Sequence, residues 1–237
     1  MIVHSEVKPG RLFAECIIIY MVTLVFTRLS HVVTHTPAAE AVYVCVLLSL
    51  MFLPLAAMRF VNRRTGEASG AEIVLSGRDA AKGLLMAVVL SPFVFLGAWI
   101  WFSVIQGYVF SPSLERMRQL EGGVLQFVLT QIILVAMPEE FFYRGYLMTT
   151  LRDGLLRRFS WSKRKTNAIV ILVVSMMFAA AHTLEGDLGR LNTFCPALLF
   201  GVLRIRSEGI LGCILLHAGC NVMMQLVITQ FIFVHSV

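Results

Sequence analysis

The chain has 237 residues, of which 58% are hydrophobic and only 14% are charged, and its mean hydropathy is +0.80. A soluble domain carries about 25% charged residues, so this composition excludes an ordinary soluble protein and indicates a membrane protein. The net charge of +6 is compatible with nucleic-acid binding. However, the basic residues gather between apolar runs, as membrane topology requires, so we expect no nucleic-acid partner.

Seven apolar runs along the chain approach the roughly 20 residues that a helix needs to cross a bilayer. The first run resembles the core of a signal peptide, but its length and the lack of a small-residue cleavage site favour a retained helix. The predicted spans cover residues 12–27, 38–58, 83–105, 124–151, 167–184, 192–203 and 210–234. Residues 59–82 form a predicted polar loop, and residues 107–123 form a mixed loop or an interfacial helix.

The distribution of basic residues supports the count of seven spans. With the N-terminus inside, fifteen of the 20 lysines and arginines fall in inside segments, Arg204 among them, four fall outside, and Arg144 lies within a span. Inside loops carry an excess of basic residues in membrane proteins. Because no repeat or second domain is visible, we predict a single membrane domain over residues 1–237. Its fold class is all-α, a polytopic transmembrane helix bundle with the N-terminus inside.

Two adjacent carboxylates, Glu139 and Glu140, interrupt the fourth apolar run, and Arg144 follows. In lipid, each charge costs several kcal/mol unless it is paired or faces water. Residues four apart share a helix face, so Glu140 and Arg144 can pair, while Glu139 points about 100° away and is available to face a cavity. Pro138 removes a helical hydrogen bond just before the carboxylates, which would kink the helix and admit water.

Two further spans carry polar residues at the same spacing. Phe178 precedes His182 by four residues in the fifth span, and His217 precedes Asn221 by four in the seventh. If the fourth, fifth and seventh spans pack together, a carboxylate base, two imidazoles and an amide converge. A base activates water, while an amide and an imidazole donate hydrogen bonds to an oxyanion. Each pair alone also fits structural packing, but their joint occurrence favours a site that hydrolyses an amide bond.

These residues resemble the CAAX-protease and bacteriocin-processing family of intramembrane peptidases, which includes the type II CAAX prenyl endopeptidases. The resemblance rests on three ordered motifs, EExxxR followed by glycine at 139–145, FxxxH at 178–182 and HxxxN at 217–221. It implies a catalytic motif core over residues 124–225. The N-terminal half matches only as generic apolar helix.

The resemblance implies a role for each matched residue. Glu139 would activate water with the help of His182, and His217 with Asn221 would stabilise the oxyanion. The supporting residues, which would orient the site, are Glu140 and Arg144. The implied protein is a glutamic-type CAAX peptidase, formerly classed as a metalloprotease. It would act on a membrane-associated peptide or protein within the lipid bilayer. The short loops and small size indicate a multi-pass protein of a prokaryotic plasma (inner) membrane.

Several alternatives stay open. Two histidines and a glutamate could hold zinc; HExxH is absent and a metal ion has no need of Asn221, so we expect no cofactor. A proton-coupled transporter or an immunity factor could use the same Glu and His cluster, although inverted repeats are absent. Cys220 with His217 or His182 would make a cysteine peptidase, and the two histidines could also hold a haem. A prenylated peptide, a leader peptide, a pheromone or a sorting tail all fit as substrate.

The five cysteines all lie in apolar stretches, and no pair shows CxxC spacing. Neither a zinc ribbon nor a redox motif is therefore indicated. We interpret the five as small buried hydrophobic residues. They are Cys16, Cys45, Cys195, Cys213 and Cys220.

Overall fold

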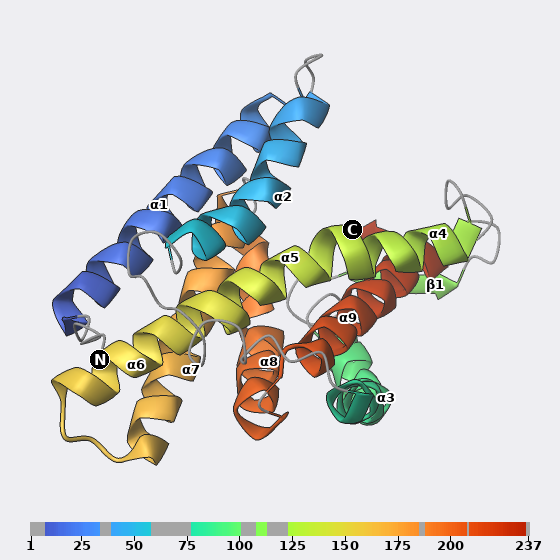
Figure 1. The fold of residues 1–237 in the computed structure, drawn as a ribbon. Helices are drawn as coiled ribbons and strands as arrows, with labels where there is room; N and C mark the ends of the chain where they lie inside the picture. Colours follow the sequence, from blue (N-terminus) through green and yellow to red (C-terminus); the bar gives the residue numbers. More distant parts are fainter. Residues whose placement is uncertain are drawn as a thin grey trace. The chain divides into compact units, whose positions relative to one another are not determined.

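The computed structural model describes residues 8–33, 39–57, 77–100, 108–112, 123–184, 188–207 and 209–235. In these ranges the chain is predominantly helical, as predicted (Figure 1). It divides into two compact units, each assembled from two separate stretches of sequence. The first unit comprises Met1–Val74 and Pro138–Ile210, and the second comprises Leu75–Met137 and Leu211–Val237. The single domain expected over residues 1–237 stays a prediction.

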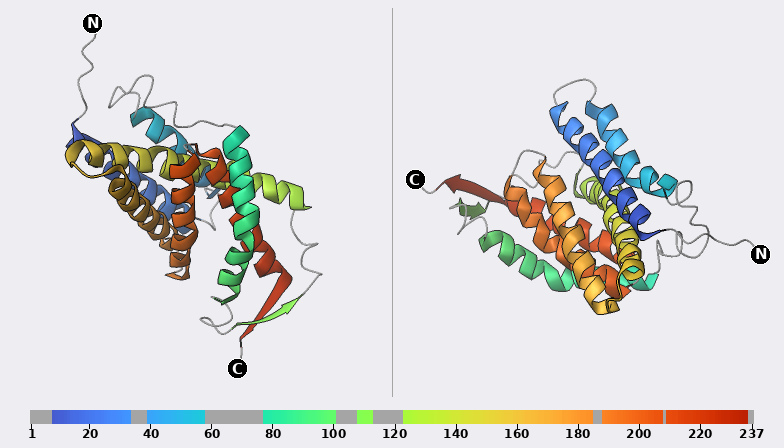
Figure 2. Two further views of the ribbon diagram at one scale, coloured as in Figure 1. Left: turned by 90° about the horizontal axis from the view of Figure 1, so that it is seen from below. Right: turned by 90° about the vertical axis from the view of Figure 1, so that its left-hand side faces the viewer.

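The first unit is a group of packed helices. Helix α1 packs against α2 and α6, and α7 packs against α6 and α8, as two further views show (Figure 2). The helices are α1 (Pro9–Val32), α2 (Ala39–Ala56), the π-helical turn η5 (Phe141–Leu147), α6 (Met148–Arg158), α7 (Lys163–Thr183), the 3-10 turn η6 (Leu188–Thr193) and α8 (Phe194–Ser207). Most of α5 (Met137–Glu140) also belongs to this unit.

Glycines mark two of the helix crossings in this unit. A Cβ atom at Gly154 of α6 would lie 2.9 Å from Cε1 of Phe13 on α1. A Cβ atom at Gly201 of α8 would lie 3.0 Å from Cγ2 of Ile171 on α7. Both distances are too short for ordinary packing, so the small residue permits the close approach of the two helices, as is common inside membranes.

Helix α1 is also joined to the helices that carry the motifs by side-chain hydrogen bonds. The donor and acceptor pairs are Tyr146 Oη to Glu15 Oε1 (2.7 Å), Tyr20 Oη to the carbonyl of Met177 (2.7 Å) and Arg28 Nη1 to the carbonyl of Leu184 (2.8 Å). Glu15 and Tyr146 are both buried. An element outside the three motifs therefore fixes the helices on which two of them lie.

The fourth predicted span is one continuous helical segment of 36 residues, Gly123–Arg158. It contains two π-helical turns, η4 (Gln131–Ala136) and η5, on either side of Pro138. The N–H of Met137 donates to the carbonyl of Ile132, and the N–H of Met148 donates to that of Tyr143. Both bonds span five residues instead of four. The helix is thus widened on both sides of Pro138, a feature that often marks functional sites, while the kink and the entry of water stay predictions.

The second unit holds α3 (Gly77–Ile100), α4 (Gly123–Thr130), η4 and α9 (Leu211–Gln230). Helix α9 packs against α3 and against η4. At the crossing of α3 and α9, a Cβ atom at Gly83 would collide with the backbone of Gly212. A pair of glycines is therefore required for this crossing.

Two short strands correct two of the predictions. Strand β1 (Tyr108–Pro112) lies where we predicted a loop or an interfacial helix, and it pairs antiparallel with β2 (Phe231–His235). The last predicted span, 210–234, is therefore wrong at its end, because α9 stops at Gln230. Most strand residues are aromatic or β-branched, which favours extended structure, but β2 is as apolar as a membrane span and follows α9 directly, with no charged residue at the junction. Helix α3 also begins earlier than predicted, at Gly77, and residues 101–105 of that span lie outside the described ranges.

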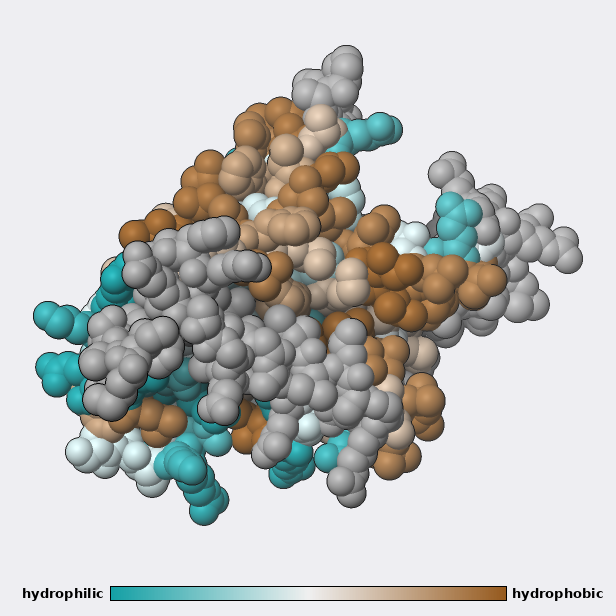
Figure 3. Space-filling model, viewed as in Figure 1, coloured by the Kyte–Doolittle hydropathy of each residue, from teal (hydrophilic) through white to brown (hydrophobic). Residues whose placement is uncertain are grey.

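Among the described residues, three helices are long and apolar enough to cross a membrane, namely Pro9–Ser30, Gly123–Arg158 and Lys163–Thr183. Shorter apolar helices are Glu40–Ala56, Ala80–Leu90 and Leu211–Gln225. Helix α8 has 14 residues and covers about 21 Å at 1.5 Å per residue, less than the hydrocarbon layer of about 30 Å. Apolar side chains cover the surfaces of α1, α2 and α4 (Figure 3), as expected for helices in lipid. The count of seven spans and their orientation stay predictions.

Candidate active site

A buried ion pair lies inside the first unit. Nη1 of Arg144 donates to Oε1 of Glu140 at 2.9 Å, and Nη2 donates to the carbonyl oxygen of Ala197 at 3.1 Å. Glu140 and Arg144 are both 0% exposed. The pair predicted from the spacing is therefore present, and helix α8 supplies a further acceptor through its backbone.

Aromatic rings surround the guanidinium group of this pair. Cζ of Arg144 lies 4.7 Å from the ring centroid of Phe178 and 5.1 Å from that of Phe200. A cation over the face of a ring is attracted by the ring electrons, more strongly where water is excluded. Phe178, the first residue of the second motif, thus contacts the arginine of the first motif, which ties α7 to η5.

A second buried arginine follows in α8. Nε of Arg204 donates to the backbone carbonyl of Arg144 at 3.3 Å, and Arg204 is only 5% exposed. The topology prediction counts Arg204 among the basic residues of an inside segment; the structure places it within α8 with its side chain buried in the protein, and the side of the membrane stays a prediction. The residue directly follows the predicted end of the sixth span, so hydropathy assigns it to the loop.

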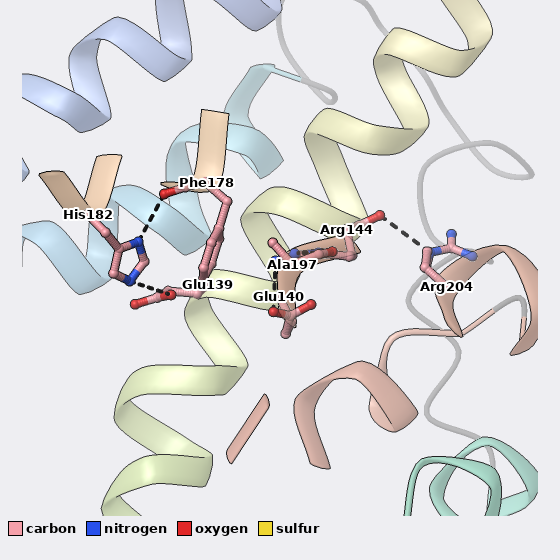
Figure 4. A network of polar contacts seen from close by, with 7 residues as sticks. All are labelled: Glu139, Glu140, Arg144, Phe178, His182, Ala197 and Arg204. Carbon is pink, nitrogen blue, oxygen red and sulfur yellow. Dashed lines mark hydrogen bonds and ion pairs between the residues drawn. The ribbon is translucent and has the colours of Figure 1, made fainter. Parts of the chain in front are cut away.

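Glu139 points away from Glu140 and towards His182 (Figure 4). Oε2 of Glu139 lies 3.9 Å from Nε2 of His182. The other ring nitrogen, Nδ1, lies 2.9 Å from the carbonyl oxygen of Phe178. Because a carbonyl only accepts hydrogen bonds, Nδ1 is the donor in this contact. The nitrogen that faces the carboxylate is therefore Nε2, whose lone pair is available whenever the ring is neutral.

The two carboxylates differ in exposure as well as in direction. The Glu139 and His182 side chains are 21% and 17% exposed, whereas Glu140 is fully buried. The rings of Phe178 and His182 are 4.5 Å apart between centroids, at an angle of 36°. The first unit therefore combines a closed ion pair with a more open pair of a carboxylate and an imidazole.

The third motif lies on α9 in the second unit. His217 is buried, and Asn221, one turn further on, donates a hydrogen bond from Nδ2 to Oε1 of Gln131 at 3.0 Å. Thus five motif residues meet in the first unit, and the last two lie one turn apart in the second. Gln131 was missed by the sequence reasoning. The sequence cue that could have revealed it is a polar amide within an apolar run. In the structure Gln131 is the first residue of the π-helical turn η4.

The structure also bears on the cysteines and on metal binding. Cys16, Cys213 and Cys220 are buried, but Cys45 and Cys195 are exposed, so the prediction of five buried cysteines is wrong for these two. Both lie on apolar helices, where lipid can replace protein packing. Within the described residues no group of three or more His, Cys, Asp or Glu side chains is suited to hold a metal ion. The expected independence from zinc is a separate matter and stays a prediction.

The long apolar helices and the buried cluster of charges indicate the class of protein. It is a membrane protein with a polar site among its helices. Residues 121–223 match the family model described as type II CAAX prenyl endopeptidase Rce1-like. This match confirms the resemblance to the CAAX protease family over that segment and supports peptidase activity at the family level. The matched segment contains all three motifs.

One curated relative matches part of the chain. An uncharacterized 24.3 kDa protein of Escherichia coli is 35% identical over 95 residues, which are 40% of this chain and 40% of that protein. The chain thus covers less than half the length of this relative. No solved structure matches the chain significantly.

Proposed function

We propose that this protein is an intramembrane endopeptidase that uses water activated by Glu139 to hydrolyse a peptide bond of a membrane-associated peptide or protein. The observation that carries the proposal is the pairing of Glu139 with His182, beside a closed ion pair. The 3.9 Å between Oε2 and Nε2 exceeds hydrogen-bonding distance. We propose that the catalytic water lies between these two groups, which requires a small outward shift of the glutamate because Oε2 is buried in the structure.

Such a water has two acceptors in reach, the carboxylate and the neutral imidazole. Glu139 accepts one proton from the water molecule while the water oxygen forms a bond to the carbonyl carbon of the substrate. The proton then passes to the amide nitrogen, the C–N bond breaks, and an acid and an amine are released. His182 orients the water, because its Nδ1 is engaged with the carbonyl of Phe178. General base catalysis of this kind contributes about 10²–10⁴-fold to the rate.

We assign the closed ion pair a positioning role. Glu140 and Arg144 fix the helix turn that carries Glu139, since the guanidinium group is held by a carboxylate, by a carbonyl of α8 and by aromatic rings. His217 and Asn221 are assigned to the oxyanion that forms on the carbonyl oxygen. An amide N–H and an imidazole N–H are suitable donors for that charge.

We further propose that the reaction needs no metal ion. An asparagine assigned to the oxyanion supports this, because a bound cation would itself stabilise that charge. Activity should survive prolonged chelation. Loss on chelation with specific recovery on adding zinc would instead assign ligand roles to Glu139, His182 and His217.

The decisive experiment compares the Glu139→Gln and Glu40→Gln variants with the wild type. Glu40 is an exposed carboxylate of α2, outside the proposed site. New protein termini should appear among the membrane proteins of cells that produce wild type or Glu40→Gln, and should be absent with Glu139→Gln at equal protein abundance. Turnover by Glu139→Gln within about tenfold of wild type contradicts the role of general base.

We also propose a multi-pass protein of a prokaryotic plasma membrane, with the N-terminus inside. The excess of basic residues in the predicted inside loops supports this orientation. Reporter fusions after Lys165 and at Val237 should report opposite sides of the membrane. Signals from the same side would mean that one of the short predicted spans, 167–184 or 192–203, does not cross.

A further inference from the structure

The turn between α6 and α7 concentrates positive charge and aromatic rings. We call residues 157–165 the basic hairpin. Five of its nine residues are cationic, two are aromatic and none is acidic. All five cations are exposed, and Phe159 is 39% exposed. The cations are Arg157, Arg158, Lys163, Arg164 and Lys165.

The aromatic side chains of the hairpin form an ordered stack. The rings of Phe159 and Trp161 lie 4.5 Å apart between centroids, at an angle of 9°. Cζ of Arg158 lies 5.4 Å from the ring of Phe159, and Nζ of Lys165 lies 4.5 Å from that of Trp161. The stack therefore has a cation at each end, and it presents an apolar aromatic surface within a positively charged one.

The position of the hairpin restricts what it can bind. One candidate membrane span, Gly123–Arg158, ends at its first residues, and another, Lys163–Thr183, begins after a link of four residues. A link of four residues cannot carry these side chains far from the helix ends, so they lie at the level of the lipid headgroups. Polar residues are visible where α6 ends and α7 begins (Figure 3). Aromatic rings favour this interfacial level, and clustered cations attract anionic lipids there.

We propose that the basic hairpin is a binding surface for anionic phospholipid headgroups of the leaflet in which it lies. Phosphate groups would contact the exposed cations, while the Phe159–Trp161 stack would enter the boundary between headgroups and acyl chains. The topology of a membrane protein requires only that its inside loops be positively charged. The aromatic stack with a cation at each end goes beyond this requirement, and it fits the lipid interface, where charged headgroups adjoin apolar acyl chains. This inference does not depend on the peptidase activity.

The test uses the fluorescence of Trp161 in the full chain with Trp99 and Trp101 replaced by Phe. The protein is reconstituted into lipid nanodiscs that contain either brominated phosphatidylglycerol or brominated phosphatidylcholine at the same mole fraction. Brominated chains quench nearby tryptophan, and we expect the anionic lipid to quench Trp161 at least about twofold more strongly. Added salt should reduce this preference, since it screens exposed charges.

Two variants separate charge from arginine-specific packing. In one, residues Arg157, Arg158 and Arg164 are all changed to Gln; in the other, all three are changed to Lys. The Gln variant should lose the lipid preference and the Lys variant should keep it. Both retain Arg152, Lys163 and Lys165, which preserves the basic character that sets the orientation of this loop.

Four outcomes would overturn the proposal. One is equal quenching by the two lipids, and another is equal behaviour of the Gln and Lys variants. The third is a stronger response of Trp161 to soluble polyglutamate in zwitterionic nanodiscs than to the anionic lipid, which would identify an acidic protein as the partner. Inorganic phosphate added to zwitterionic nanodiscs should have no effect; an equivalent response to it would show that free phosphate is bound and the lipid is not.

Discussion

Both units place polar side chains among apolar helices, but the first unit uses charges and the second uses neutral amides. In the first, Glu140 and Arg144 are fully buried and are held by groups from three elements. In the second, Asn221 and Gln131 share one hydrogen bond and stay partly exposed. A buried charge tolerates no loss of its partners, whereas an amide loses much less when it exchanges one partner for another.

This difference fits the roles that we propose, in which the charged pair positions the general base and the amide stabilises the oxyanion. The groups that position the base must be in place before the substrate arrives, and a closed ion pair provides such a fixed arrangement. A donor to an oxyanion must accept a new partner during each reaction, and a half-buried amide can do so. If the comparison is correct, substitutions in the charged network should act mainly on stability, and substitutions in the amide pair mainly on turnover.

The largest effect is expected from breaking the ion pair. Arg144→Met leaves Glu140 as an uncompensated buried charge, which should destabilise the protein by about 3–5 kcal/mol. Adding Glu140→Leu should recover part of the loss, because two apolar side chains can replace a buried pair. Unfolding in lipid nanodiscs, followed for both variants and for the exposed-site control Arg206→Met, measures these changes. A single variant as stable as the control contradicts the comparison.

A smaller effect is expected from Asn221→Ala, and it should appear in turnover. Loss of one donor to an oxyanion lowers kcat by about 10²–10³-fold, while the unfolding free energy should change by only about 0.5–1.5 kcal/mol. Single-turnover kinetics with a substrate found by the terminal-proteomics experiment separates kcat from KM. An equal loss of stability and activity would place Asn221 in a structural role.

The smallest effect is expected from Gln131, which we interpret as a positioning residue for Asn221. Gln131→Met removes the acceptor of the Asn221 amide. The variant should lower kcat by up to about tenfold with KM unchanged, because a tenfold loss corresponds to the energy of one neutral hydrogen bond. Gln131→Glu retains an acceptor oxygen and should be affected less. The matched control is Gln126→Met, since Gln126 is exposed on α4. Equal behaviour of the two Met variants would show that the hydrogen bond does not position Asn221.

The sequence predicted the contacts that lie within one helix. Spacing by four residues brings Glu140 to Arg144 and Phe178 to His182, because helix geometry alone determines those distances. Contacts between helices left no such pattern. The carbonyl of Ala197 is a backbone group that every residue has, so nothing in the composition points to it as a partner of Arg144.

The same limit applies to α1 and to the strands. The hydrogen bonds of Glu15 and Tyr20 reach residues more than a hundred positions away, and only packing decides which partner they find. Strand β2 could not be separated from α9 because both are apolar, and period alone does not distinguish short apolar runs. The π-helical turns were likewise invisible, since they change which carbonyl accepts each bond without changing composition.

Those turns have a consequence for how the chain tolerates insertions and deletions. A bond that spans five residues accommodates one residue more than an α-helical bond, so each π-helical turn behaves as an α-helix with a single residue added. Removing one residue from η4 would therefore restore the ordinary bonding there, while the helical turns on either side keep nearly the same facing. Gln131 begins this segment, and Glu139 follows its last residue by three. A homologue that is one residue shorter at this point should thus have an uninterrupted α-helix there and need no compensating insertion nearby.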